Sequence, residues 1–116
     1  MKHIKDLKMQ LNKSNPVVRD TYDTTRIFIT LIEGYENDFP SVSRRGGCFY
    51  KDIPQVLPFN VGQYISFNLF SVKIEGIHWL NQYHAMGVYT GTTYIKPSDD
   101  IIKCMYELEN EGYIEI

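Results

Sequence analysis

The chain has 116 residues, a net charge of −2 at pH 7 and an apolar fraction of 43%. This length corresponds to one domain, and the balance of hydrophobicity and charge excludes an intrinsically disordered chain. The mild acidity disfavours a strongly basic nucleic-acid binder, and without an apolar run of about 18 residues we expect no membrane partner.

The first expected element is a short helix over residues 2–13. Ile4, Leu7 and Leu11 recur there at helical spacing, with lysines on the other face. Pro16 ends it, because the residue before a proline avoids the α region. We therefore expect an N-terminal helix that packs on the rest of the domain.

Residues 26–32 give the clearest strand signal in the chain. Ile27, Ile29 and Leu31 alternate with Phe28 and Ile32, so both faces of this strand are mostly apolar. A strand of this kind is buried on both sides. We place it at the centre of the sheet, covered on both faces.

The apolar residues change parity between residues 65–69 and residues 70–74. Side chains alternate along a strand with a period of two, so one flat strand cannot switch faces in this way. We expect a bulge or a tight reversal near Asn68–Ser71. Gly76 marks a further break before residues 77–80.

The last helix is the best specified. Ser98 is a suitable N-cap, Ile101, Met105 and Leu108 form its buried stripe, and Gly112 is the expected residue just past its end. Residues 113–116 then alternate as a terminal strand, which should dock on the sheet because an exposed apolar edge invites aggregation.

These elements predict an α+β fold. We expect a single domain over residues 1–116, with a mostly antiparallel sheet of about five strands and an N-terminal and a C-terminal helix packed on it. Two cysteines and no signal-peptide pattern favour a reducing, cytoplasmic location.

The residues that support catalysis or metal binding are scattered. Cys48, His78 and His84 match no zinc-binding spacing, so we expect no metal and no cofactor. A small acid–base enzyme is one alternative, with Glu75 and His78 as its candidate pair. We assign no catalytic residue.

A second alternative is a module that binds RNA, single-stranded DNA or nucleotides. Its residues would come from one segment: Ser43, Arg44, Arg45, Gly46, Gly47, Phe49 and Tyr50. Consecutive glycines allow a nest of backbone N–H groups that binds anions beside two guanidinium groups. Aromatic rings on a sheet can stack on bases. An ordinary loop explains the same segment.

The first choice is a non-enzymatic protein-binding domain that acts by occupying a partner's surface. An inhibitor, an immunity protein or a phage-encoded antagonist of host defence works in this way. The chain has nine tyrosines, and Tyr is enriched at binding hot spots. The candidate contact residues are Tyr35, Phe39, Tyr83, Tyr89 and Tyr94. The sequence leaves the oligomeric state open.

Overall fold

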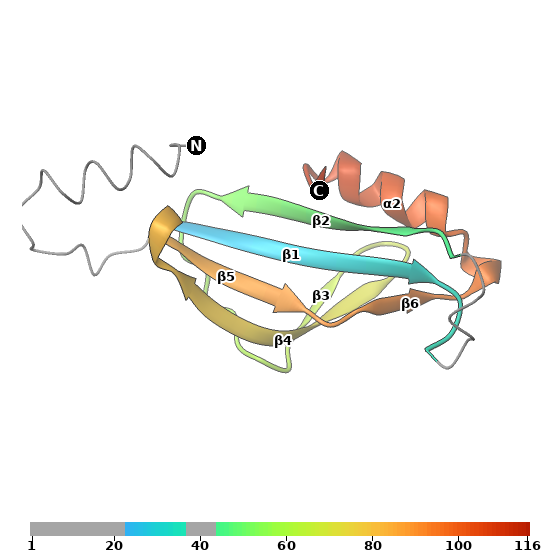
Figure 1. Ribbon diagram of the computed structural model, residues 1–116, viewed down its shortest axis with the longest axis horizontal. Coiled ribbons are helices and arrows are strands. Elements are labelled where there is room, and N and C mark those ends of the chain that lie inside the picture. The colour runs from blue at the N-terminus through green and yellow to red at the C-terminus, as the bar shows by residue number, and fades with distance from the viewer. Residues whose placement is uncertain (1–22, 37–43) are drawn as a thin grey trace, which may run out of the picture.

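The computed structural model describes residues 23–36 and 44–116, which form a seven-stranded sheet with one α-helix (Figure 1). The strand order is β3-β4-β5-β1-β2-β7, and β6 also pairs with β1. The elements are β1 (Thr24–Glu33), β2 (Gly46–Ile53), β3 (Tyr64–Ser66), β4 (Ser71–Leu80), the 3-10 turn η1 (Asn81–Tyr83), β5 (Ala85–Thr90), β6 (Thr93–Ile95), the 3-10 turn η2 (Pro97–Asp99), α2 (Ile101–Asn110) and β7 (Ile114–Glu115).

β1 is the central strand, as predicted. It pairs with β2 in the antiparallel sense on one side, and with β5 and then β6 in the parallel sense on the other. The other three strand pairings are antiparallel, so the sheet is mixed but mostly antiparallel. The α+β class is confirmed. The sheet has seven strands, more than the five or so that the sequence predicted. The helix expected over residues 2–13 lies outside the described residues.

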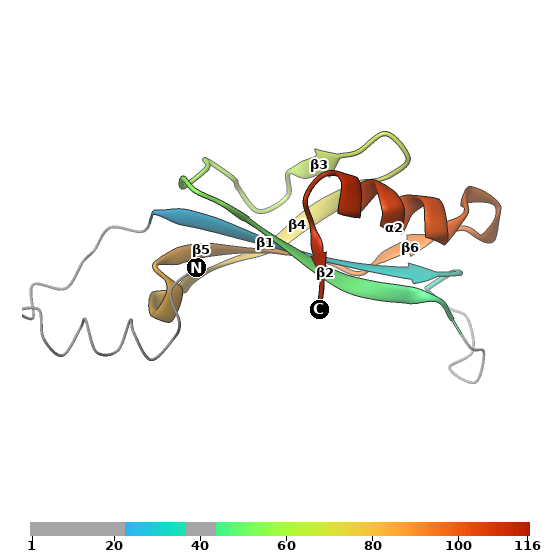
Figure 2. The same ribbon diagram turned by 90° about the horizontal axis from the view of Figure 1, so that it is seen from above.

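One face of the sheet is covered. α2 and β3 lie on the same side of β1 and β2 (Figure 2). Ile27, Ile29 and Leu31 point to this side and are buried. From the helix, Ile101, Cys104 and Leu108 complete the core. The sequence assigned the middle of the helical stripe to Met105, but that residue is only half-buried and Cys104 takes its place.

The two ends of α2 differ in how well the sequence predicted them. Asp100, and not Ser98, is the N-cap, since its side chain accepts a hydrogen bond from the Ile102 amide at 3.1 Å. Ser98 is taken up by the preceding turn η2, so the helix starts two residues later. Gly112 ends the helix as predicted, with a φ of 93° that suits glycine.

The parity change near residue 70 is a tight reversal, as predicted. β3 and β4 form an antiparallel hairpin in which the Phe67 amide donates to the Phe70 carbonyl at 2.8 Å. The break expected at Gly76 is instead a register shift inside one continuous strand, between Ile74 and Gly76. A bulge of this kind bends a strand without ending it.

The terminal strand also docks as predicted. Ile114 pairs with Tyr50, so β7 lies on the outer edge of β2. The Ile116 amide donates to the Cys48 carbonyl at 2.8 Å and extends this contact. The turn between α2 and β7 is held by Lys51, whose ammonium donates to the carbonyl of Glu111.

Candidate functional site

The sequence predicted that both faces of β1 are covered, but this does not hold for the second face of the sheet. Within residues 23–36 and 44–116, no helix or strand lies over it (Figure 2). Paired residues of neighbouring strands lie on the same face, so the register defines its members. We call this surface the open face. Its members in the centre of the sheet are Arg26, Phe28, Thr30, Ile32, Cys48, Tyr50, Asp52, Gly87, Tyr89 and Tyr94.

An ion pair stands at one end of the open face. Arg26 and Asp52 lie opposite each other on β1 and β2. The Arg26 Nε donates to Asp52 Oδ1 at 2.7 Å, and Nη2 donates to Oδ2 at 2.9 Å. Arg26 is only 8% exposed, and these hydrogen bonds raise the pKa of its guanidinium. The pair is therefore held in one geometry with its charges neutralised.

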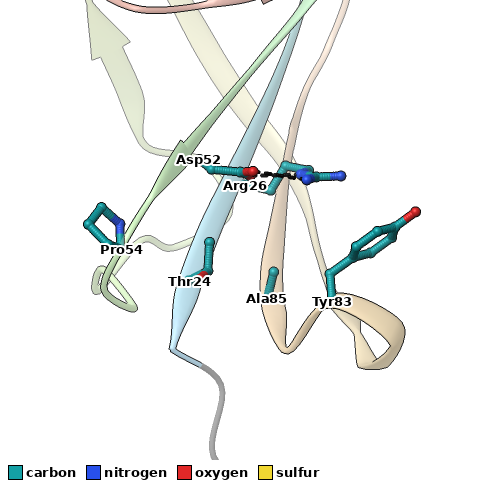
Figure 3. A pocket seen from close by; sticks show the side chains of 6 residues that line it. All are labelled: Thr24, Arg26, Asp52, Pro54, Tyr83 and Ala85. Atoms are coloured by element: carbon teal, nitrogen blue, oxygen red, sulfur yellow. Dashed lines mark hydrogen bonds and ion pairs between the residues drawn. The ribbon is translucent and has the colours of Figure 1, made fainter. Parts of the chain in front are cut away.

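Two tyrosine rings flank this guanidinium. Its central carbon lies 5.0 Å from the ring centre of Tyr50 and 4.7 Å from that of Tyr83. These distances are those of cation–π contacts. Tyr83 belongs to η1, beside the start of β5, and its ring extends from there toward Arg26 (Figure 3). Segments distant in sequence thus converge on one arginine.

A pocket of about 220 Å³ lies at this place (Figure 3). Its walls come from Thr24, Arg26, Asp52, Pro54, Tyr83 and Ala85. Pockets that enclose a whole cofactor or drug-sized ligand usually exceed about 300 Å³. The size and the mixed lining suit a group no larger than one amino-acid side chain.

A stack of rings forms the middle of the open face. The rings of Phe28 and Tyr89 are 4.7 Å apart and nearly parallel, with an interplanar angle of 9°. His78 of β4 lies edge-on to Tyr89 at 5.1 Å. On the same strand as Tyr89, a Cβ at Gly87 would lie 3.0 Å from the Tyr89 ring and 3.1 Å from the Leu80 side chain. Glycine at this position leaves room for both side chains to lie over it.

The open face is almost free of net charge. In β1, β2, β5 and β6, the only charged side chains that the register places on it are Arg26 and Asp52. They neutralise each other. A surface of this kind offers aromatic area and tyrosine hydroxyls, and it gives little attraction to phosphate groups.

Three of the five residues expected at a protein contact belong to this region. Tyr89 and Tyr94 lie on the open face, and Tyr83 borders it. Tyr35 is exposed but follows the far end of β1, and Phe39 lies outside the described residues. Sequence reasoning missed Arg26 and Phe28, although their positions alternate with the buried residues of β1.

The segment expected to bind anions has a different structure. Gly46 and Gly47 begin β2, and neither has the positive φ that an anion-binding nest requires. Gly46 and Gly47 therefore do not form the nest that the sequence predicted. A Cβ at Gly46 would lie 2.3 Å from the Leu31 carbonyl oxygen, so glycine is needed for close strand approach. Arg45 is held by Glu33, with Nη2–Oε2 at 2.5 Å.

The remaining members of that segment are divided between the two faces. Tyr50 lies on the open face, whereas Phe49 is fully buried in the core on the opposite side. The Phe49 ring is therefore not accessible to a base. Arg44 is half-buried, and Ser43 lies outside the described residues.

The candidate acid–base pair is not assembled. A Cβ at Gly91 would contact the carboxylate of Glu75 at 2.5 Å, whereas His78 lies against Tyr89. No hydrogen bond joins these two described side chains.

In the described ranges, no group of three or more histidine, cysteine or acidic side chains could hold a metal ion. Cys104 is buried, which raises the pKa of its thiol.

No protein-family model, curated protein or solved structure matches this chain. Among the described residues, no helix has the length and apolar character needed to cross a membrane. The functional argument therefore depends on the geometry of the open face.

Proposed function

We propose that this chain is a non-enzymatic protein-binding domain that acts by occupying a partner's surface through its open face. The observation that carries the proposal is the aromatic surface around Phe28 and Tyr89, fixed in one arrangement and free of net charge. An inhibitor, an immunity protein or a phage-encoded antagonist of host defence would use such a surface in this way.

The surface favours a partner patch that is apolar and uncharged at its centre. Tyrosine supplies a large contact area at a low cost in conformational entropy, and its hydroxyl offers a hydrogen bond. The contacts of Arg26 with Tyr50 and Tyr83 hold these rings in place before a partner arrives. Less ordering is then required on binding, which increases affinity. The neighbouring pocket would take one side chain of the partner.

The nucleic-acid alternative has less support from the same surface. Binding to RNA or DNA depends mainly on the neutralisation of phosphates by cations. On the open face the cation Arg26 already forms an ion pair with Asp52, and elsewhere Arg45 pairs with Glu33. The acid–base enzyme has less support still, because Glu75 and His78 lie against different neighbours.

Capture with matched variants of the chain tests the proposal. The wild type, Tyr50→Ala with Tyr94→Ala, and Tyr64→Ala with Tyr106→Ala would serve as baits in a lysate of the source cells. Tyr64 and Tyr106 are exposed on β3 and α2, away from the open face. The control variant therefore removes two tyrosine side chains from a different surface.

We expect the wild type and the control to retain one protein in stoichiometric amount, and the open-face variant to lose it. Truncating a hot-spot tyrosine costs about 2 kcal/mol or more, which is roughly a thirtyfold loss of affinity. Titration of the purified partner would measure this loss directly. Equal retention by all three baits, or no retained protein, would refute the proposal.

A further inference from the structure

The outer edge of β4 is a second surface, separate from the open face. β3 pairs only with the first part of β4, where Tyr64–Ser66 lie opposite Ser71–Lys73. Past the bulge, Gly76–Leu80 pairs with β5 on its inner side. Among the described residues, no strand pairs with its outer side, so this stretch is an edge of the described sheet.

The five residues of this edge carry none of the side chains that usually prevent strand pairing. Natural edge strands carry lysine, proline or inward charges, and Gly76–Leu80 contains none of these. Trp79 is 55% exposed, and Ile77 packs at the border of the core on the same side of the strand. An edge of this composition favours the addition of another strand.

We propose that the occupant of this edge is the same stretch of a second copy of the chain. The two copies of Gly76–Leu80 would pair in the antiparallel sense about a two-fold axis at His78. The result would be one continuous sheet across two subunits. Most soluble homo-oligomers are dimers of this symmetry, in which the same patch is used on both sides.

The ends of the stretch select this register. The bulge before Gly76 and the turn η1 after Leu80 bound the regularly paired part of the strand. Residues directly opposite each other must lie on the same face, and only a pairing centred on His78 then uses all five positions.

The side chains are complementary in this register. The exposed ring of Trp79 would lie opposite Ile77 of the partner subunit, so each ring is covered by an apolar neighbour. Leu80 would lie opposite Gly76 of the partner subunit, which carries no side chain of its own. Cross-strand pairs of aromatic and β-branched residues stabilise antiparallel strands.

A disulfide at the symmetry axis tests the register. Opposed residues of antiparallel strands have Cα atoms about 4.5–5.5 Å apart, within the range that a disulfide spans. His78→Cys in a Cys48→Ser background should give a covalent dimer on air oxidation, seen on a non-reducing gel. Lys73→Cys in the same background is the control, because β3 covers that part of β4. We expect it to stay monomeric.

Sedimentation of the full chain over a range of concentrations tests the association itself. We expect a monomer–dimer equilibrium that Trp79→Lys and His78→Glu each weaken about fivefold or more. Circular dichroism would check that both variants fold. A wild type that stays monomeric, variants that dimerise equally well, or equal cross-linking at residues 73 and 78 would overturn the proposal. Trp79 pairs with Met86 and lies on the side of the sheet away from the open face, so the result for Trp79→Lys is independent of the proposed function.

Discussion

Arg26 and Asp52 face each other across β1 and β2, and the guanidinium and carboxylate share two hydrogen bonds at 2.7 and 2.9 Å. The arginine is nearly inaccessible to solvent and lies between two tyrosine rings. One ion pair thus links the register of the central strands to the shape of the open face.

Loss of the carboxylate should destabilise the fold. Asp52→Ala leaves the Arg26 guanidinium without this partner in a poorly solvated position, and we expect a loss of about 2 kcal/mol in the free energy of unfolding. Urea denaturation measures it. The matched control is Glu33→Ala, which breaks the exposed pair with Arg45 and should have a smaller effect. Equal losses would contradict the structural role of the first pair.

The buried phenol of Tyr113 should make the stability of the fold depend on pH in the alkaline range. Burial, and secondarily the charge of Glu111, raise the pKa of Tyr113 from 10.0 to about 12. The folded state therefore keeps the phenol proton in a range where the unfolded chain releases it. This contribution is complete below pH 10 and is lost as pH rises through about 12. It amounts to roughly 2–3 kcal/mol.

The variant Tyr113→Phe isolates this contribution. Unfolding measured between pH 9 and 12 should show a shallower loss of stability in the variant than in the wild type. Tyr106→Phe, at an exposed position of α2, should follow the wild type. The interpretation fails if the wild type and Tyr113→Phe lose stability in parallel.

Glu107 should control the β3–β4 hairpin. Its carboxylate accepts hydrogen bonds from the amides of Asn68 at 2.7 Å and Leu69 at 2.9 Å, and so joins the turn to α2. Glu107→Ala should cost about 1–2 kcal/mol and speed hydrogen exchange at these two amides. Glu109→Ala, on an exposed position of the same helix, should leave both exchange rates unchanged. Unaltered exchange in Glu107→Ala would refute this role.

Gly46 should tolerate no side chain. A Cβ there would lie 2.3 Å from the Leu31 carbonyl oxygen, so Gly46→Ala forces the two central strands apart. We expect a loss of about 1–3 kcal/mol in thermal or urea unfolding. If Gly46→Ala is as stable as the wild type, the close approach of β1 and β2 at this point is incorrect.

Sequence reasoning succeeded where the signal was local. The alternation along residues 26–32, the parity change near residue 70 and the glycine after α2 each depend on neighbouring positions. It failed where the decisive contact was distant. Gly46 and Gly47 resemble a loop in the sequence, and only the position of the Leu31 carbonyl shows why a strand requires glycine there.

The open face was only partly predictable for the same reason. Tyr83, Tyr89 and Tyr94 were expected at a contact surface, but their convergence depends on the register of β1 with β5 and β6. Arg26 and Asp52 lie 26 positions apart in the sequence, and no periodic pattern pairs them. A hairpin register between residues 26–32 and 48–52 would have predicted this ion pair.

Site-specific photo-cross-linking tests most directly whether the open face is the binding surface. A benzophenone side chain would replace Tyr94 in one variant and Tyr106 in another, each expressed in the source cells. We predict that position 94, on the open face, cross-links to one distinct protein, and that position 106, on α2, does not. Cross-linking of the same protein from position 106 alone, or no cross-linked protein from position 94, would contradict the account.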